Sequence, residues 1–218
     1  IKSRIKATEA SIRLMEKLEP KPRVFVNASA IGIYGHSSSH TFTEDNETGG
    51  ENNFLKTVVL QWEEAAKKVM ELNIRTVLPR IGLVLDRNNG ALPKMLLPYQ
   101  LFAGGALGSG KQWYSWIHID DVVRLFNFAI HNEEISGPLN VTAPHPVQMN
   151  ELGKALGHVL HRPHWLPVPT FALKAILGEM SSLLLEGQKV IPEKALDYGF
   201  SFSFPTIEKA VQHIFQKS

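Results

Sequence analysis

The sequence predicts an α/β protein, in which amphipathic helices alternate with short buried strands. Residues 2–18 carry apolar side chains at helical spacing, and the run Val24–Ala28 has the length and β-branching of a buried strand. A second helix is expected from about residue 53 to residue 72, with a strand at Arg75–Leu78 directly after it. Because each strand follows a helix, the pattern predicts a parallel sheet that is flanked by helices.

The middle of the chain is rich in glycine and proline, but it is too apolar for a linker. For residues 83–117 we expect loops and short helices that fold over another part of the molecule. The segment SWIHIDDVVRLFNFAI predicts a strand or turn that leads into a helix with Asp120 or Asp121 at its N-cap, and Leu139–Thr142 predicts a third strand. From Pro144 onward the pattern is helical and interrupted by prolines.

The composition excludes several classes of function. The chain has 218 residues, of which 44% are hydrophobic, so it can bury a large core. Its 23 Lys and Arg against 21 Asp and Glu include no basic run, so nucleic acid is not expected as a partner. The absence of cysteine excludes disulfides and thiol chemistry, and it fits a cytoplasmic location.

A membrane partner is not expected either. The longest apolar stretch, Phe171–Leu185, is interrupted by Lys174 and Glu179 and is too short for a membrane span. We interpret this stretch as a core helix or a pair of helices.

Five segments of the sequence stand in an order that is typical of one family. They are VFVNASAIGIYG, WEEAAKKV, RTVLPRIGLVL, GSGKQWYSWIHIDDVV and GPLNVTAPHPVQMNELGKAL. In this order they resemble the extended short-chain dehydrogenases/reductases, which include the NAD-dependent sugar epimerases and dehydratases. The similarity is greatest to a poorly characterised epimerase-like subfamily, and it continues through RPHWLPVPTFALKAILGEMSSLLLEGQKVIPEKALDYGFSFSFPT.

The resemblance implies a Rossmann-type, doubly wound parallel sheet and a small, mainly helical C-terminal domain on the substrate side. Residues 1–143 would be the remainder of the NAD(P)-binding domain, with residues 83–117 as loops toward the substrate. Residues 144–218 would be the C-terminal epimerase-family domain, which ends in an amphipathic helix predicted at Thr206–Phe215.

The resemblance also implies an opening strand, a Gly-rich turn and a helix that hold the dinucleotide. The chain instead opens at Ile1, without Met or a signal pattern, and it contains no GxGxxG or GxxGxxG motif. The GGALGSG segment at Gly104–Gly110 follows a loop and opens no helix, so we do not interpret it as a phosphate loop. We expect that about 70 to 90 residues precede this chain in the whole protein.

The cofactor implied by the resemblance is NADP or NAD, with NADP preferred. Ligands of parallel α/β sheets bind beyond the carboxyl ends of the strands. The candidate cofactor-binding residues are therefore Ala28, which ends the first predicted strand, and the four residues just beyond the second, namely Pro79, Arg80, Ile81 and Gly82. In a second interpretation, the Arg80 side chain binds either the helix that carries Glu63 or an acidic residue of a loop.

The proton chemistry of the family is altered in this chain. In the family, a Ser or Thr after the fourth strand orients the substrate, and a Tyr-x-x-x-Lys pair on the next helix transfers protons. Ser29 stands at the hydroxyl position. The Tyr and Lys positions are apolar in both possible alignments, at Phe54 and Val58 or at Leu55 and Val59. Any such reaction therefore needs another acid or base.

Two other side chains are candidates for this role. Tyr34 follows Ser29 on the same loop and could reach the nicotinamide, or it is a packed aromatic whose hydroxyl meets the backbone. His118 stands near Asp120, and a neighbouring carboxylate can tune an imidazole to act as a base. Alternatively, His118 donates a hydrogen bond to a carbonyl at a strand end. Lys56 is turned by roughly 200° from the lysine position, so we expect it in solvent.

Aromatic residues and histidines leave further alternatives. Trp113 and Trp116, with Tyr114 between them, either stack on a substrate or close the core. Three histidines follow one another at a spacing of three residues, namely His158, His161 and His164. They lack an acidic partner, and a proline interrupts their helix, so no metal site is expected.

Three hypotheses of function follow. The first is an NAD(P)-dependent epimerase or oxidoreductase for a small hydroxylated or nucleotide-sugar-like substrate. The second is a silent dinucleotide-binding sensor, and the third is a structural or cell-division-related interaction protein. A homodimer through residues 2–18 and 53–72 is expected, although packing of these helices on their own sheet explains the same apolar faces. The first two hypotheses require Ser29 and Arg80 to lie on neighbouring strands.

Overall fold

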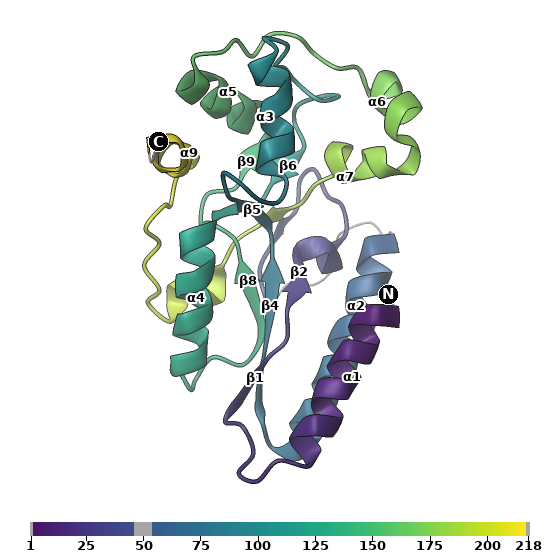
Figure 1. Cartoon of the computed structure of the whole chain (residues 1–218), viewed down its shortest axis with the longest axis vertical. Coiled ribbons are helices and arrows are strands. Elements are labelled where there is room, and N and C mark those ends of the chain that lie inside the picture. The colour runs from purple at the N-terminus through teal and green to yellow at the C-terminus, as the bar shows by residue number, and fades with distance from the viewer. Residues whose placement is uncertain (1, 46–53, 217–218) are drawn as a thin grey trace.

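The computed structural model describes residues 2–45 and 54–216 (Figure 1). Its α-helices are α1 (Lys2–Glu16), α2 (Phe54–Lys67), α3 (Leu92–Gln100), α4 (Ile119–His131), α5 (Met149–Leu160), α6 (Thr170–Leu177), α7 (Ser182–Leu185), α8 (Glu193–Asp197) and α9 (Ile207–Gln216). Its strands are β1 (Val24–Val26), β2 (Ser29–Ala30), β3 (Thr41–Phe42), β4 (Arg75–Ile81), β5 (Leu83–Leu85), β6 (Trp113–Tyr114), β7 (Trp116–His118), β8 (Gly137–Val141), β9 (Val147–Gln148) and β10 (Lys189–Val190). The described residues also form 3₁₀ turns at Ile31–Tyr34 (η1), Lys68–Leu72 (η2) and Gly178–Ser181 (η3).

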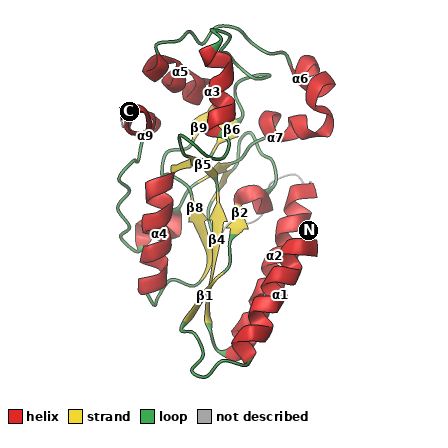
Figure 2. Ribbon diagram, viewed as in Figure 1, coloured by secondary structure: helices red, strands yellow, loops and turns green. Residues whose placement is uncertain are grey.

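The predicted parallel sheet is confirmed. The strand β4 is central, with β1 and β2 paired along one edge and β8 along the other, all in parallel. Figure 2 shows α1 and α2 on one side of this sheet and α4 on the other. Helices on both sides of a parallel sheet define a Rossmann-type arrangement, as expected from the sequence.

The strand predicted at Val24–Ala28 is divided into β1 and β2. The Asn27 N–H donates to the Val77 carbonyl at 3.0 Å. Because alternate residues of a strand face the same neighbour, Pro79 also faces this edge, where it has no N–H to donate. The ladder is interrupted there and resumes with β2.

The strand predicted at Arg75–Leu78 is longer than expected. It continues as β4 to Ile81. Pro79, Arg80 and Ile81 are therefore residues of the central strand and not of the loop that follows it. The sequence pattern failed here because an arginine and a proline are unusual in the middle of a buried sheet.

Residues 83–117 were expected as loops and short helices, and this expectation is corrected in part. They contain α3 and the short strands β5, β6 and β7, which pair as β5–β7 (parallel) and β6–β9 (antiparallel). The N-cap of α4 is also corrected: it is His118, whose Nδ1 accepts from the Asp120 N–H at 3.0 Å, and not Asp120 or Asp121.

The part of the molecule beyond the carboxyl ends of the central strands includes residues 92–114 and 147–185, which we call the cap (Figure 1). The glycines of the GGALGSG segment are explained here by close packing. A Cβ on Gly104 would lie 2.4 Å from the Tyr99 ring, and one on Gly105 would lie 1.9 Å from the Leu166 carbonyl oxygen. The apolar stretch Phe171–Leu185 forms the helices α6 and α7 around η3.

The helices α1 and α2 pack against each other along their length (Figure 1). The Trp62 Nε1–H donates to the Thr8 hydroxyl at 3.1 Å, and Ile12 and Met15 are buried. The homodimer through these helices remains a prediction. The expected start of the second helix, at residue 53, lies outside the described residues. Within residues 2–45 and 54–216, no helix has both the length and the apolarity to cross a membrane.

Candidate functional site

A network of buried polar side chains lies at the carboxyl end of the central sheet. The register pairs Ser29 of β2 with Arg80 of β4. The two residues are thus direct neighbours, as the sequence-based hypotheses required.

The Arg80 side chain is bound to the helix α2 through Glu63. Its Nε and Nη2 each donate to a different oxygen of Glu63 at 2.9 Å, and the two side chains are 1% and 3% exposed. Two parallel charge-assisted bonds of this kind give both energy and a fixed orientation. The second interpretation of Arg80, in which it ties down the helix of Glu63, is therefore confirmed.

Ser29 belongs to the same network. Its hydroxyl donates to the Glu63 Oε1 at 2.5 Å, and the residue is 3% exposed. A hydroxyl has one hydrogen to donate. In this arrangement Ser29 can still accept a hydrogen bond, but its own proton is held by Glu63.

Tyr34 is buried at the centre of the network. Its hydroxyl donates to the Asn140 Oδ1 at 2.7 Å and accepts from the Arg80 Nη1 at 3.0 Å. Burial raises the pKa of Tyr34 to about 12, although the nearby Arg80 opposes this shift. An acid or base that works near neutral pH needs the opposite shift.

Two members of the network could not be identified from the sequence. The Asn140 N–H donates to the Glu44 Oε1 at 2.8 Å, and the Asn140 side chain donates to the Ile191 carbonyl at 2.9 Å. Burial raises the pKa of Glu44. The available signal was weak: an asparagine within the otherwise apolar run of β8 indicates a buried polar contact but not its partner.

The structure distinguishes the two pairs of α2 residues that the sequence offers as the family's Tyr and Lys positions. A Cβ on Gly32 would lie 3.5 Å from the Leu55 Cβ and 3.8 Å from a Val59 methyl group. Leu55 and Val59 therefore face the η1 turn that follows Ser29. This contact favours the alignment at Leu55 and Val59 over the one at Phe54 and Val58; Leu55 is 42% exposed and Phe54 is 72% exposed. Asn52 and Asn53, on which the other alignment depended, lie outside the described residues.

The candidate cofactor residues differ in what they can offer a ligand. Ala28, Ile81 and Gly82 are partly exposed at the carboxyl edge of the sheet. Gly82 is required by packing, because a Cβ there would lie 2.2 Å from the Ser115 carbonyl oxygen. The edge is thus apolar and partly open, which suits the face of an aromatic ring.

His118 is not brought to this network. It caps α4, on the other side of the sheet from α2 (Figure 1), and it is 2% exposed. Its ring stacks on Phe204 at 4.0 Å, and its Nε2 lies 3.2 Å from the Nδ1 of His213 in α9.

These contacts also indicate the tautomer of the neutral His118 ring. Its Nδ1 accepts the Asp120 N–H, so in the neutral ring the proton is on Nε2, which faces His213. His118, Asp120 and His213 place possible ligand atoms within 4.8 Å of one another. A cation on Nε2 would have to displace that proton while Nδ1 remains an acceptor, so hydrogen bonding describes the cluster better than metal binding.

The two tryptophans have different surroundings. Trp116 is fully buried in the core, and its Nε1–H donates to the His145 carbonyl at 3.1 Å, as its core interpretation proposed. Trp113 is partly exposed and donates to the Ser38 carbonyl at 3.1 Å, with the Lys189 ammonium 4.9 Å from its ring centre.

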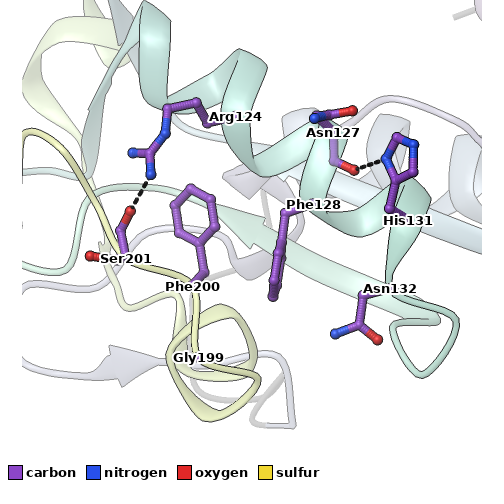
Figure 3. A pocket seen from close by; sticks show the side chains of 8 residues that line it. All are labelled: Arg124, Asn127, Phe128, His131, Asn132, Gly199, Phe200 and Ser201. Atoms are coloured by element: carbon purple, nitrogen blue, oxygen red, sulfur yellow. Dashed lines mark hydrogen bonds between the residues drawn. The ribbon is translucent and has the colours of Figure 1, made fainter.

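A cavity of about 520 Å³ lies away from the network, against α4 (Figure 3). Phe128 and Phe200 line it, and Arg124 crosses one end. The Arg124 guanidinium is already bound to Asp121 at 2.7 Å and to the Ser201 carbonyl at 2.8 Å. The cavity therefore offers no unpaired charge to a ligand from this arginine.

The fold defines the class of the protein: a Rossmann-type α/β protein with a buried polar network at the carboxyl ends of its parallel strands. The chain belongs to the NAD dependent epimerase/dehydratase family, whose sequence model matches residues 1–142. Residues 168–214 match a second family model, which is described as a domain of unknown function.

Named relatives agree with this assignment. The epimerase family protein YfhF of Bacillus subtilis is 47% identical over 214 residues, which are 98% of this chain and 70% of the relative. The structure of human epimerase family protein SDR39U1 (isoform 2) with NADPH superposes with a TM-score of 0.91 at 33% identity, over 99% of this chain and 73% of that one. A nucleoside-diphosphate sugar epimerase from Corynebacterium glutamicum gives a TM-score of 0.79 at 29% identity, over 99% of this chain and 42% of that one.

Proposed function

We propose that this chain is part of an NADP(H)-binding member of the epimerase family that holds the dinucleotide without the family's Tyr–Lys proton transfer. The observation that carries the proposal is the pair Leu55 and Val59, which face η1 where the ionisable pair is expected. Neither side chain can give or take a proton.

The neighbouring polar groups do not replace that pair. Tyr34 has a pKa of about 12, and the Ser29 proton is held by a carboxylate that is itself paired with Arg80. Within the described residues, the polar groups of this network are therefore occupied by one another. Their arrangement supports a rigid binding edge rather than a proton relay.

The carboxyl edge of the sheet fits the nicotinamide half of a dinucleotide. Ala28, Ile81 and Gly82 would line it as an apolar, partly open wall. When bound, the dinucleotide supplies the hydride donor or acceptor of the family's chemistry. The preference for NADP over NAD rests on the human relative, whose structure was solved with NADPH.

Turnover is the second candidate. The Corynebacterium neighbour is named as a nucleoside-diphosphate sugar epimerase. This similarity favours an epimerase or oxidoreductase that acts on a small hydroxylated or nucleotide-sugar-like substrate. Trp113, partly exposed beside Lys189, is the residue that we would assign to stacking on such a substrate.

Calorimetric titration of the full-length protein with NADPH and NADH tests the proposal. We expect NADPH to bind more tightly than NADH. When nucleotide sugars are added, we expect neither a change at the absorbance band of the reduced cofactor nor formation of a second sugar epimer. The variant Ala28→Phe places a ring at the edge, so NADPH affinity should fall by about tenfold or more. The matched control is Ala10→Phe at an exposed position of α1, which should bind as the unmodified protein does.

The outcomes separate the candidates. Binding without turnover supports the silent role, and steady turnover with any nucleotide sugar overturns it in favour of the second candidate. If neither NADPH nor NADH binds to the folded protein, both candidates fail.

A further inference from the structure

The helix α3 of the cap is apolar on two opposite faces. One face is buried in the core through Leu92, Leu96 and Tyr99. The opposite face carries Leu97, which is 56% exposed, and Leu101, which is 77% exposed. A surface helix usually places polar residues on its outer face, so the apolar outer face of α3 needs its own explanation.

Phe102 extends this outer face with a strained backbone. It has a φ of +59°, a conformation that bulky side chains rarely adopt and that glycine usually supplies at the end of a helix. Its N–H donates to the Tyr99 carbonyl at 3.0 Å, and its side chain is 55% exposed. An aromatic ring thus stands in solvent at a position where a glycine would be less strained. Strain that is retained in this way is a reason to look for function.

Trp165 completes the surface. The residue is 64% exposed, and its Nε1–H donates to the Phe102 carbonyl at 2.9 Å. Since its polar atom is already satisfied by the protein, the indole can enter an apolar medium without leaving an unpaired donor. The Arg162 guanidinium lies 4.2 Å above the Phe102 ring and adds a positive charge beside it.

The two chain segments that carry these residues have charged side chains of one sign only. The segments Arg87–Ile119 and Leu152–Gly178 contain no Asp or Glu. Both segments carry basic residues, which are Arg87, Lys94, Lys111, Lys154, Arg162 and Lys174. All four apolar side chains of the surface come from these two acid-free segments. A partner that suits them is apolar and negatively charged.

We propose that Leu97, Leu101, Phe102 and Trp165 form a docking surface for an anionic lipid bilayer. Exposed Trp, Phe and Leu flanked by Lys and Arg is the pattern by which proteins lie on a bilayer without crossing it. Lys94 is exposed one turn before Leu97 and meets the headgroups together with Arg162. A second copy of the same face would bring like charges together, which disfavours self-pairing.

A bilayer as partner differs from the expectation from sequence, which was that the protein has no membrane partner. That expectation rested on the lack of a spanning segment. Peripheral binding needs no such segment, because the side chains enter only the boundary between headgroups and acyl chains.

Co-sedimentation of the full-length protein with two kinds of vesicle tests the proposal. We expect binding to vesicles of phosphatidylcholine mixed with phosphatidylglycerol, little binding to phosphatidylcholine alone, and a decrease with added salt. The double variant Leu101→Ser/Trp165→Ser should bind at least about tenfold more weakly. The matched control is Met70→Ser, which removes a 61% exposed apolar side chain outside the cap and should bind as the unmodified protein does.

Circular dichroism and thermal unfolding establish that each variant is folded. No binding of the folded protein to anionic vesicles overturns the proposal, as does equal loss in the Met70→Ser control. Analytical ultracentrifugation tests whether a second copy of the chain covers this surface instead. If the protein is a dimer and Leu101→Ser/Trp165→Ser abolishes that dimer, the surface belongs to a second copy and the proposal is overturned.

Discussion

The central sheet and the cap hold their parts together by different means. In the sheet, the contact between β4 and α2 depends on formal charges that are completely buried, Arg80 and Glu63. In the cap, α3 and α5 are joined through neutral groups. The Tyr99 hydroxyl lies 2.8 Å from the His164 Nδ1, and the His164 Nε2 lies 3.2 Å from the Asn150 Oδ1.

This difference determines how each part can change. A buried charge must stay paired, so the sheet and α2 have one favourable relative position. Neutral hydrogen bonds at a partly exposed histidine can be exchanged for bonds to water at a smaller cost. We therefore expect the sheet to be the rigid part and the cap to be the part that opens at lower free energy.

The largest expected effect comes from breaking the buried pair. Glu63→Gln removes the carboxylate from Arg80 and from Ser29, and it should lower the free energy of unfolding by about 3 to 5 kcal/mol. Urea denaturation followed by circular dichroism measures this loss. Glu64→Gln is the matched control, because Glu64 is exposed and its contact with Lys67 is 3.8 Å long; its effect should stay below about 0.5 kcal/mol.

A double variant sharpens this comparison. Replacing both partners, as Glu63→Leu/Arg80→Met, removes both charges together and should recover most of the loss. If the double variant is as unstable as Glu63→Gln, uncompensated charge is not the cause of the instability.

An intermediate effect is expected in the cap, where packing rather than charge sets the structure. Gly105→Ala places a Cβ 1.9 Å from the Leu166 carbonyl oxygen, so the backbone must shift, at a cost of about 1 to 3 kcal/mol. Thermal unfolding measures the change. Gly32→Ala is the matched control, since its Cβ would meet only ordinary contacts of 3.5 Å and 3.8 Å. Equal effects of the two variants would contradict the close approach in the cap.

The smallest effect is expected from Tyr34→Phe, at about 1 to 2 kcal/mol near neutral pH, because it removes one hydroxyl from the network. The effect depends on pH. The pKa of Tyr34 is raised from 10.0 to about 12, so the folded state favours the protonated phenol. The stability that this preference contributes is complete below pH 10 and is lost as the pH rises through 12.

Urea denaturation across this pH range provides the measurement. The deficit of Tyr34→Phe relative to the unmodified protein should shrink as the pH rises from 10 toward 12. Tyr198→Phe, at a position that is 39% exposed, is the control and should change little. Parallel curves for Tyr34→Phe and the unmodified protein would mean that burial does not perturb this phenol.

Much of the fold could be predicted from the sequence, but the details of β4 could not. Helices α1, α2, α4 and α9 follow from apolar spacing, and the parallel order follows from the alternation of helices and strands. Pro79 and Arg80 were predicted to follow the strand, because a proline and a charge at the centre of a sheet contradict local preference. Their cost is offset by partners that are distant in sequence, and local patterns contain no information about such partners.

The sequence by itself determined the α/β class and the order of its elements, since these depend on residue type and on spacing along the chain, and it predicts that the Tyr–Lys pair is absent. The tertiary structure alone decided what the polar residues do. It joined Ser29 and Arg80 to Glu63 on one side of the sheet and placed His118 on the other. The physical reason is that a hydrogen bond or ion pair requires a partner within about 3 Å, and only the folded chain decides which residues meet at that distance.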